Sequence, residues 1–311
     1  MSKIAFVFPG QGSQAVGMGK ALCQAFPEAQ AVLDEADAAL GEKLSTLCFE
    51  GPEDALKLTA NTQPAILAVS VAAHAVFSKR GPAPIFVAGH SLGEYSALVA
   101  AGAMPLADAV RAVRARGTFM QEAVPPGVGA MAAVLGLLPE KVKEVCDAVA
   151  EGQVLQPANY NSPEQTVIAG HAEAVARAAT KLKEAGAKKV MPLPVSAPFH
   201  SPLMEPVKPR LAEVLSRISF SAPTVPVVTN VEAKPNADAS RIQALLVEQV
   251  TAPVRWIECV LELERQGVTR VVELGPGKVL GGLVKRITKG IESYNLETPE
   301  QLEKVLAAVG G

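Results

Sequence analysis

Five consecutive residues, Gly89-His90-Ser91-Leu92-Gly93, bring a hydroxyl, an imidazole and two glycines together. The segment fits the pattern Gly-x-Ser-x-Gly and lies between an apolar run and a helical stretch. Two glycines permit a sharp strand-to-helix turn that exposes the serine hydroxyl, and the backbone N–H of Leu92 can then stabilise an oxyanion. We therefore predict that Ser91 is a nucleophile. The alternative is a helix cap without chemistry.

A serine hydroxyl needs a general base at neutral pH, and the chain has four histidines. His74 lies in an alanine-rich core helix, His90 should leave the turn in another direction, and His171 begins a helix. His200 lies in the proline-bracketed loop SAPFHSP (196–202), and loops held in this way are well suited to catalysis. By elimination, His200 is the predicted base.

A catalytic histidine usually has an orienting partner, and no persuasive carboxylate lies between Ser91 and His200. Farther along the chain, Gln249 shares a helix face with Leu245 and Leu246, close to the helix end. A polar residue in an apolar stripe indicates a role at a site. An ordinary glutamine in the last helical turn is the alternative.

One arginine lies on the apolar face of the helix predicted over 105–124. The positions that share this face are Ala109, Ala112, Val113, Arg116, Met120 and Ala123. A buried arginine is costly unless it is paired, so Arg116 indicates a two-pronged site for a ligand carboxylate or phosphate. A structural ion pair or a side chain that reaches solvent is the alternative.

The first glycine-rich turn, GQGSQA (10–15), formally matches a dinucleotide-binding fingerprint. That fingerprint needs an acidic residue at the end of a second strand, whereas Asp34 and Asp37 lie in a helical stretch. A nucleotide role is therefore disfavoured. The turn could instead present backbone N–H groups, such as that of Gln11, towards the serine.

Composition excludes several classes of protein. The net charge of −2 gives no basic field for nucleic acid, and the four cysteines form no CxxC pair, so neither a disulfide framework nor a metal site is expected. The N-terminal apolar run is too short for a signal peptide, and the longest apolar helix is too short for a bilayer span. We expect a cytoplasmic protein without nucleic-acid or membrane partners.

Apolar runs followed by glycine-rich turns and helices predict an α/β fold with a parallel sheet covered on both faces, in a larger hydrolase-like domain. Its strands are predicted at IAFVF (4–8), IFVAG (85–89), VPVVTN (225–230) and VVEL (271–274).

The middle of the chain has the order β-α-β-β-α-β, which is typical of a ferredoxin-like unit. The strands are expected over 129–136, 154–160, 165–170 and 188–195. We therefore predict an inserted subdomain at 125–196 and a discontinuous catalytic domain at 1–124 and 197–311, with a substrate cleft between them.

Seven motifs occur together and in order along the whole chain, and they closely resemble those of the malonyl-CoA:acyl-carrier-protein transacylases of bacterial fatty acid synthesis. Similar acyltransferase domains occur in polyketide synthases. The motifs are FPGQGSQ (8–14), GHSLGEYSAL (89–98), RGTFMQ (116–121), NYNSPEQTVIAG (159–170), SAPFHSPLM (196–204), EQVTAPVRW (248–256) and ELGPGKVL (273–280).

The resemblance implies that malonyl passes from malonyl-CoA to Ser91 and then to the phosphopantetheine thiol of an acyl carrier protein, without a cofactor. It implies that His200 is the base, that Gln249 holds its ring through a side-chain or backbone oxygen, and that Arg116 binds the malonyl carboxylate. The oxyanion hole would be the N–H groups of Gln11 and Leu92. The same motifs supply further candidates for substrate binding: His90, Asn159 and Asn161.

Carrier proteins are acidic, so a basic rim is expected, with Lys188, Lys189, Lys285 and Arg286 as candidates or as ordinary solvated charges. We expect a monomer. Two other classes remain open: a serine esterase or thioesterase that uses water as acceptor, and a carrier-protein binding module without catalysis. The apolar-face position of Arg116 argues against the first, and the intact Ser91 and His200 argue against the second.

Overall fold

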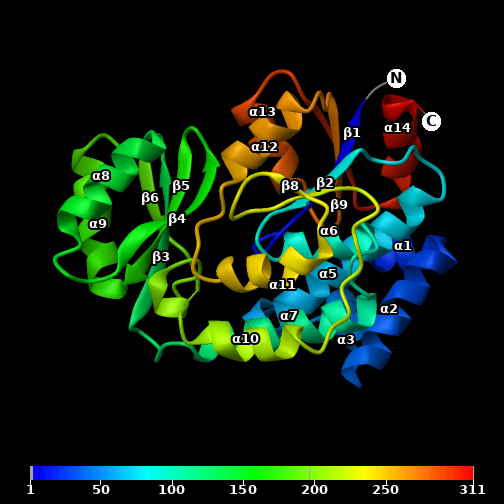
Figure 1. Cartoon of the computed structure of the whole chain (residues 1–311), viewed down its shortest axis with the longest axis horizontal. Coiled ribbons are helices and arrows are strands. Elements are labelled where there is room, and N and C mark those ends of the chain that lie inside the picture. The colour runs from blue at the N-terminus through cyan, green and yellow to red at the C-terminus, as the bar shows by residue number, and fades with distance from the viewer. Residues whose placement is uncertain (1–2, 196, 311) are drawn as a thin grey trace.

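The computed structural model of this chain describes residues 3–195 and 197–310. The predicted domain limits at residues 1, 196 and 311 lie outside the described residues. Two separate sheets form the framework (Figure 1). The six-stranded sheet contains β1 (Ile4–Phe8), β2 (Phe86–Gly89), β7 (Val227–Val228), β8 (Pro235–Asn236), β9 (Arg270–Leu274) and β10 (Glu292–Leu296). The four-stranded sheet contains β3 (Gly129–Leu135), β4 (Leu155–Ser162), β5 (Gln165–His171) and β6 (Lys189–Pro192).

Helices cover both sheets. They are α1 (Lys20–Ala25), α2 (Pro27–Leu40), α3 (Leu44–Glu50), α4 (Glu53–Lys57), α5 (Thr59–Ser78), α6 (Gly93–Ala100), α7 (Leu106–Glu122), α8 (Pro139–Val149), α9 (Ala172–Glu184), α10 (Val207–Leu215), α11 (Ala239–Glu248), α12 (Trp256–Arg265), α13 (Val279–Ile287) and α14 (Pro299–Val309), with a 3-10 turn at Pro202–Met204. Among the described residues, no helix is both long and apolar enough to cross a bilayer.

The large sheet has the order β10-β9-β1-β2-β7-β8, and its strands pair in parallel except for β8, which runs antiparallel to β7. Alternate residues of the central strand β1 face opposite layers, as a strand with two covered faces requires. Ile4, Phe6 and Phe8 pack with α5, α6 and α7, whereas Ala5 and Val7 pack with α12 and α13. The predicted parallel α/β architecture is confirmed.

The small sheet has the order β4-β5-β3-β6, and every neighbouring pair is antiparallel. Helices α8 and α9 cover its outer face (Figure 1), where Ala132 and Val134 of β3 are buried against them. The other face carries Met131 and Ala133, which pack with Phe199 of the loop that leads to His200. This is the predicted ferredoxin-like arrangement. The exact limits 125–196 stay a prediction.

The strand predicted over 225–230 is shorter in the structure, because β7 contains only Val227 and Val228. The N–H of Thr229 still donates to the carbonyl oxygen of Lys234, next to β8, whereas the N–H of Asn230 donates to the Glu94 carboxylate. Strand β10 and helix α14 were not predicted. The sequence ESYNL of β10 has no apolar run, since an edge strand is only partly buried.

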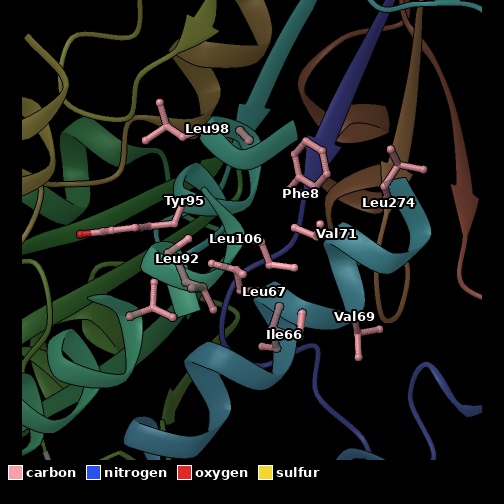
Figure 2. Close-up of a cluster of buried hydrophobic side chains, with 14 of the residues drawn as sticks. Phe8, Ile66, Leu67, Val69, Val71, Leu92, Tyr95, Leu98, Leu106 and Leu274 are labelled. Carbon is pink, nitrogen blue, oxygen red and sulfur yellow. The ribbon is translucent and has the colours of Figure 1, made fainter. Parts of the chain in front are cut away.

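A tightly packed core lies beneath the turn that carries Ser91. Figure 2 shows Leu92 and Tyr95 near Ile66 and Leu67 of α5, and Leu98 farther along α6. All five side chains are buried. Close packing of this kind leaves side chains few alternative positions, so the core holds the start of α6 in place.

Candidate active site

The turn between β2 and α6 places Ser91 in the left-handed region, with a φ of 51°. A non-glycine residue rarely adopts this conformation, and such strain is typical of functional sites. Both flanking residues must be glycine, because a side chain at either position would clash with the backbone nearby. A Cβ on Gly89 would lie 1.9 Å from the backbone of Gly93, and a Cβ on Gly93 would lie 2.1 Å from the Phe8 carbonyl oxygen.

His200 lies against the serine, with 2.8 Å between its Nε2 and Ser91 Oγ. On the other side of the ring, Nδ1 lies 2.8 Å from the carbonyl oxygen of Gln249 and 3.1 Å from that of Ala252. Carbonyl oxygens only accept hydrogen bonds, so Nδ1 carries the proton and Nε2 is free to accept the serine proton. Burial, assisted by the nearby charge of Arg116, lowers the pKa of His200 to about 3.

Gln249 directly follows α11 and is fully buried. Its backbone oxygen holds His200, whereas its side chain faces other groups. The amide Nε2 donates to the carbonyl oxygen of Ser91 at 3.1 Å and to Glu94 at 2.8 Å, and Oε1 accepts from Arg116 at 2.9 Å. The family resemblance allows either the side-chain or the backbone oxygen of Gln249, and the backbone oxygen is the one that contacts the imidazole.

Arg116 is 1% exposed on α7, in the apolar stripe that the sequence indicated. Its Nη1 donates to Gln63 at 2.9 Å, and its Nη2 lies 3.2 Å from Ser91 Oγ. Among residues 3–195 and 197–310, no carboxylate forms an ion pair with this guanidinium, and its Nε has no hydrogen-bond partner. A buried cation beside Ser91 therefore has spare donors for an anionic ligand.

Asn230 is a residue of the site that sequence reasoning missed. Its Oδ1 accepts from the N–H of Ser91 at 2.7 Å, and its Nδ2 donates to the carbonyl oxygen of Gly89 at 2.7 Å. The side chain thus holds both sides of the strained turn. Its signal in the sequence was its place at the carboxyl end of a predicted parallel strand, where ligand sites gather.

The N–H groups proposed for the oxyanion hole point to no internal partner. In the described part of the chain, neither Gln11 N–H nor Leu92 N–H donates a hydrogen bond, and the Gln11 side chain donates to Thr59 at 3.3 Å. A cavity of about 110 Å³ contains Ser91 and His200. The other residues that line it are Gln11, His90, Met131, Asn159, Leu193, Val195 and Phe199.

The remaining candidates lie where β4 of the small sheet meets the large sheet. His90 Nε2 lies 2.7 Å from Asn161 Oδ1, and Asn159 forms an isolated β-bridge with Val254. All three line a second cavity of about 220 Å³, which shares Gln11, His90, Asn159 and Leu193 with the first. A larger hollow of about 600 Å³ between α10 and α11 contains neither Ser91 nor His200.

The other two histidines lie outside this cluster, as elimination had suggested. His74 packs edge-on against Phe6 in the core, where burial lowers its pKa to about 4. His171 precedes α9, and its Nδ1 accepts a hydrogen bond from the N–H of Val154.

Comparison with known proteins agrees with this geometry. Residues 5–300 match the family model described as an acyl transferase domain. The malonyl CoA-acyl carrier protein transacylase of Escherichia coli K12 is 50% identical, over 98% of this chain and 99% of the relative. The crystal structure of an acyl carrier protein S-malonyltransferase from Vibrio cholerae aligns with a TM-score of 0.95 at 47% identity, covering 98% of this chain and 100% of that one.

A further solved structure is a malonyl-transacylase in complex with a type II polyketide synthase acyl-carrier protein. It aligns with a TM-score of 0.96 at 48% identity and covers 99% of this chain and 100% of that one. The residues of the site all lie within the span 5–300 that the family model matches. The chain therefore belongs to the acyl transferase family, among the malonyl CoA-acyl carrier protein transacylases.

Proposed function

We propose that this chain moves a malonyl group from malonyl-CoA to the phosphopantetheine thiol of an acyl carrier protein, through an ester on Ser91. The observation that carries the proposal is the buried guanidinium of Arg116, 3.2 Å from Ser91 Oγ and without a carboxylate partner in the described residues. An acyl group with its own carboxylate fits this arrangement, because it supplies the missing anion.

In the first half-reaction, Ser91 Oγ attacks the thioester carbon while its proton passes to Nε2 of His200. The N–H groups of Gln11 and Leu92 stabilise the oxyanion. The carbon–sulfur bond then breaks, and CoA leaves with the proton that His200 held. Arg116 binds the carboxylate of the malonyl ester.

In the second half-reaction, the carrier thiol gives its proton to His200 and attacks the ester carbonyl. The ester bond breaks, and His200 returns the proton to Ser91 Oγ. The same residues therefore act twice in a ping-pong cycle. The CoA thioester is a substrate, and none of these steps requires a cofactor.

His90, Asn159 and Asn161 line the wider part of the cleft and are proposed to contact the substrate beyond the acyl group. The carrier protein is proposed to dock on a basic rim formed by Lys188, Lys189, Lys285 and Arg286. Arg286 of α13 lies 3.4 Å from Gln165 of β5, so this part of the proposed rim lies where α13 meets the small sheet. We further propose a monomer that works in the cytoplasm and supplies fatty acid biosynthesis.

A polyketide synthase carrier is a second candidate acceptor, because the solved complex described above contains such a carrier. Acceptor competition tests this choice. The protein is loaded with malonyl-CoA and offered equal amounts of a fatty-acid carrier protein and a polyketide carrier protein, both as holo forms. Faster discharge to the fatty-acid carrier supports the proposed pathway, and faster discharge to the other carrier contradicts it. Steady release of CoA without either carrier would indicate a hydrolase.

A further inference from the structure

Glu94 is a buried carboxylate that none of the proposed chemical steps uses. It lies in the first turn of α6, three residues after Ser91, and is 2% exposed. Its Oε2 accepts hydrogen bonds from the N–H of Asn230 at 3.0 Å and from Nε2 of Gln249 at 2.8 Å. Burial raises the pKa of Glu94 to about 7, so the fold carries an unfavourable ionisation at this position.

The contacts of the Gln249 amide indicate what this carboxylate does: it helps to fix the orientation of the amide. On one side the amide faces Glu94 and the carbonyl oxygen of Ser91, which accept hydrogen bonds, and on the other it faces Arg116, which only donates. Nε2 must therefore point to the two acceptors and Oε1 to the guanidinium. A flipped amide would set Oε1 against two acceptors and Nε2 against a cation.

We propose that Glu94 is a positioning residue for malonyl recognition, which fixes the amide of Gln249 so that its Oε1 holds Nη2 of Arg116 beside Ser91. The inference rests on the proposed function, because it concerns how the carboxylate of the substrate is bound. It assigns to Glu94 an effect on the choice of acyl group and none on proton transfer.

Glu94 acts on Arg116 through Gln249, and this indirect contact leaves the charge of the guanidinium unpaired within residues 3–195 and 197–310. Glu94 and Arg116 form no ion pair in the described residues, and Gln249 lies between them. A carboxylate in direct contact would occupy the guanidinium donors that the substrate needs. The neutral amide orients the cation and leaves its Nε and part of Nη1 available.

The test compares three variants in the acylation of Ser91, with malonyl-CoA and acetyl-CoA measured separately. E94M removes the acceptor oxygens at similar size, and E94Q keeps one oxygen that can accept from Gln249. E273Q is the matched control, because Glu273 is equally buried but binds the N–H groups of Leu280 and Gly281 at the start of α13.

We expect E94M to lower the malonyl-to-acetyl ratio of kcat/KM by at least about tenfold, the loss typical of a hydrogen bond to a charged group. The malonyl loss should come mainly through KM. E94Q should keep the ratio within about threefold of the wild type, since its oxygen replaces the lost acceptor. E273Q should leave the ratio unchanged even if it lowers the Tm.

Equal losses for both acyl groups in E94M would overturn the proposal, because a purely structural role lowers both. An E94M variant that loses no activity with either acyl group would overturn the proposal too. If E94M does not fold, E94D provides the comparison, since it keeps the charge but withdraws the acceptor by one methylene. A larger loss of malonyl acylation than of acetyl acylation in E94D supports the proposal, and equal losses overturn it. A wild-type protein that takes no malonyl group would instead contradict the proposed function itself.

Discussion

The Nδ1 atom of His200 lies 2.8 Å from the backbone carbonyl oxygen of Gln249. In the proposed mechanism, this contact takes the place of the carboxylate in a serine hydrolase triad. A carbonyl oxygen fixes the tautomer and the ring direction as a carboxylate does, but it carries no full charge to stabilise an imidazolium. The site instead has a cation, Arg116, close to the same ring. Burial and this cation lower the pKa of His200 more than the carbonyl contacts raise it, so the free base is neutral.

The first prediction concerns the pH dependence of acylation. With its pKa lowered to about 3, His200 is unprotonated throughout the range from pH 5 to 8. The profile of kcat/KM for malonyl-CoA, which reports the free enzyme, should therefore show no inflection near the ordinary histidine value of 6.5. Stopped-flow acylation across this range measures it. A limb near 6.5 that persists in E94Q, which has no carboxyl group to titrate at position 94, would contradict the assigned environment of His200.

The second prediction concerns Arg116. Arg116→Ala should cost malonyl transfer about 2–5 kcal/mol, the range for a broken desolvated charge pair, and acetyl transfer should fall less. Arg114→Ala is the matched control, because Arg114 lies on the same helix but is partly exposed and pairs with Glu42. Acylation rates with both thioesters provide the measurement. Equal losses for the two acyl groups would rule out a carboxylate-binding role.

The third prediction separates the backbone of Gln249 from its side chain. Gln249→Ala keeps the carbonyl oxygen that holds His200, so acetyl transfer should fall far less than the roughly 10⁴-fold seen when a triad carboxylate is replaced. Malonyl transfer should fall more, because Arg116 loses an acceptor at 2.9 Å. An equally large loss of malonyl and acetyl transfer would show that the side chain of Gln249, and not its backbone oxygen, orients the His200 ring.

The fourth prediction concerns Asn230, which holds both sides of the serine turn. Asn230→Ala leaves the N–H of Ser91 and the carbonyl oxygen of Gly89 without this partner and should lower the free energy of unfolding by about 1–3 kcal/mol. Malonyl and acetyl transfer should fall together, because the nucleophile itself moves. Denaturant unfolding and both acylation rates test this, and a loss confined to malonyl transfer would contradict it.

The fifth prediction links Glu94 to stability. Below its ordinary pKa of 4.5, the carboxyl group is protonated in both states, so it adds no pH dependence. Between pH 4.5 and about 7, the unfolded chain loses this proton while the folded protein keeps it, so the free energy of unfolding falls as pH rises. E94Q has no carboxyl group at this position, so its free energy of unfolding does not fall for this reason. Its stability relative to the wild type should rise by up to about 3 kcal/mol over this range.

Denaturant unfolding of wild type and E94Q at pH 5 and pH 8 measures the difference. His200 has the opposite dependence, since its lowered pKa makes stability fall as pH drops below 6.5. That contribution is present in both proteins and cancels in the comparison. A constant difference between the two pH values would show that the Glu94 carboxyl has the same pKa in both states.

Much of this structure could be predicted from local patterns. The apolar run before Gly89 and the helical stretch after Gly93 placed Ser91 in a turn, and the apolar stripe of α7 placed Arg116 in the core. Ser91 and Arg116 could be predicted because the residues adjacent to them in the sequence determine their local structure and burial.

Other parts of the site depend on contacts between distant segments. Asn230 meets Ser91 across 139 positions, and the oxygen that holds His200 belongs to the backbone, which is chemically the same at every residue. Glu94 was visible only as part of a motif, because its partners come from two other segments. The edge strand β10 escaped prediction for a different reason, since it buries too little apolar surface to show a pattern.

The most direct test of the central claim is the intact mass of the protein after incubation with malonyl-CoA or, separately, acetyl-CoA, followed by peptide mapping. We predict a malonyl adduct on Ser91, much weaker labelling by acetyl-CoA, and discharge of the malonyl group on addition of a holo acyl carrier protein. A mass that stays unchanged with malonyl-CoA, or an adduct on a residue other than Ser91, would contradict it.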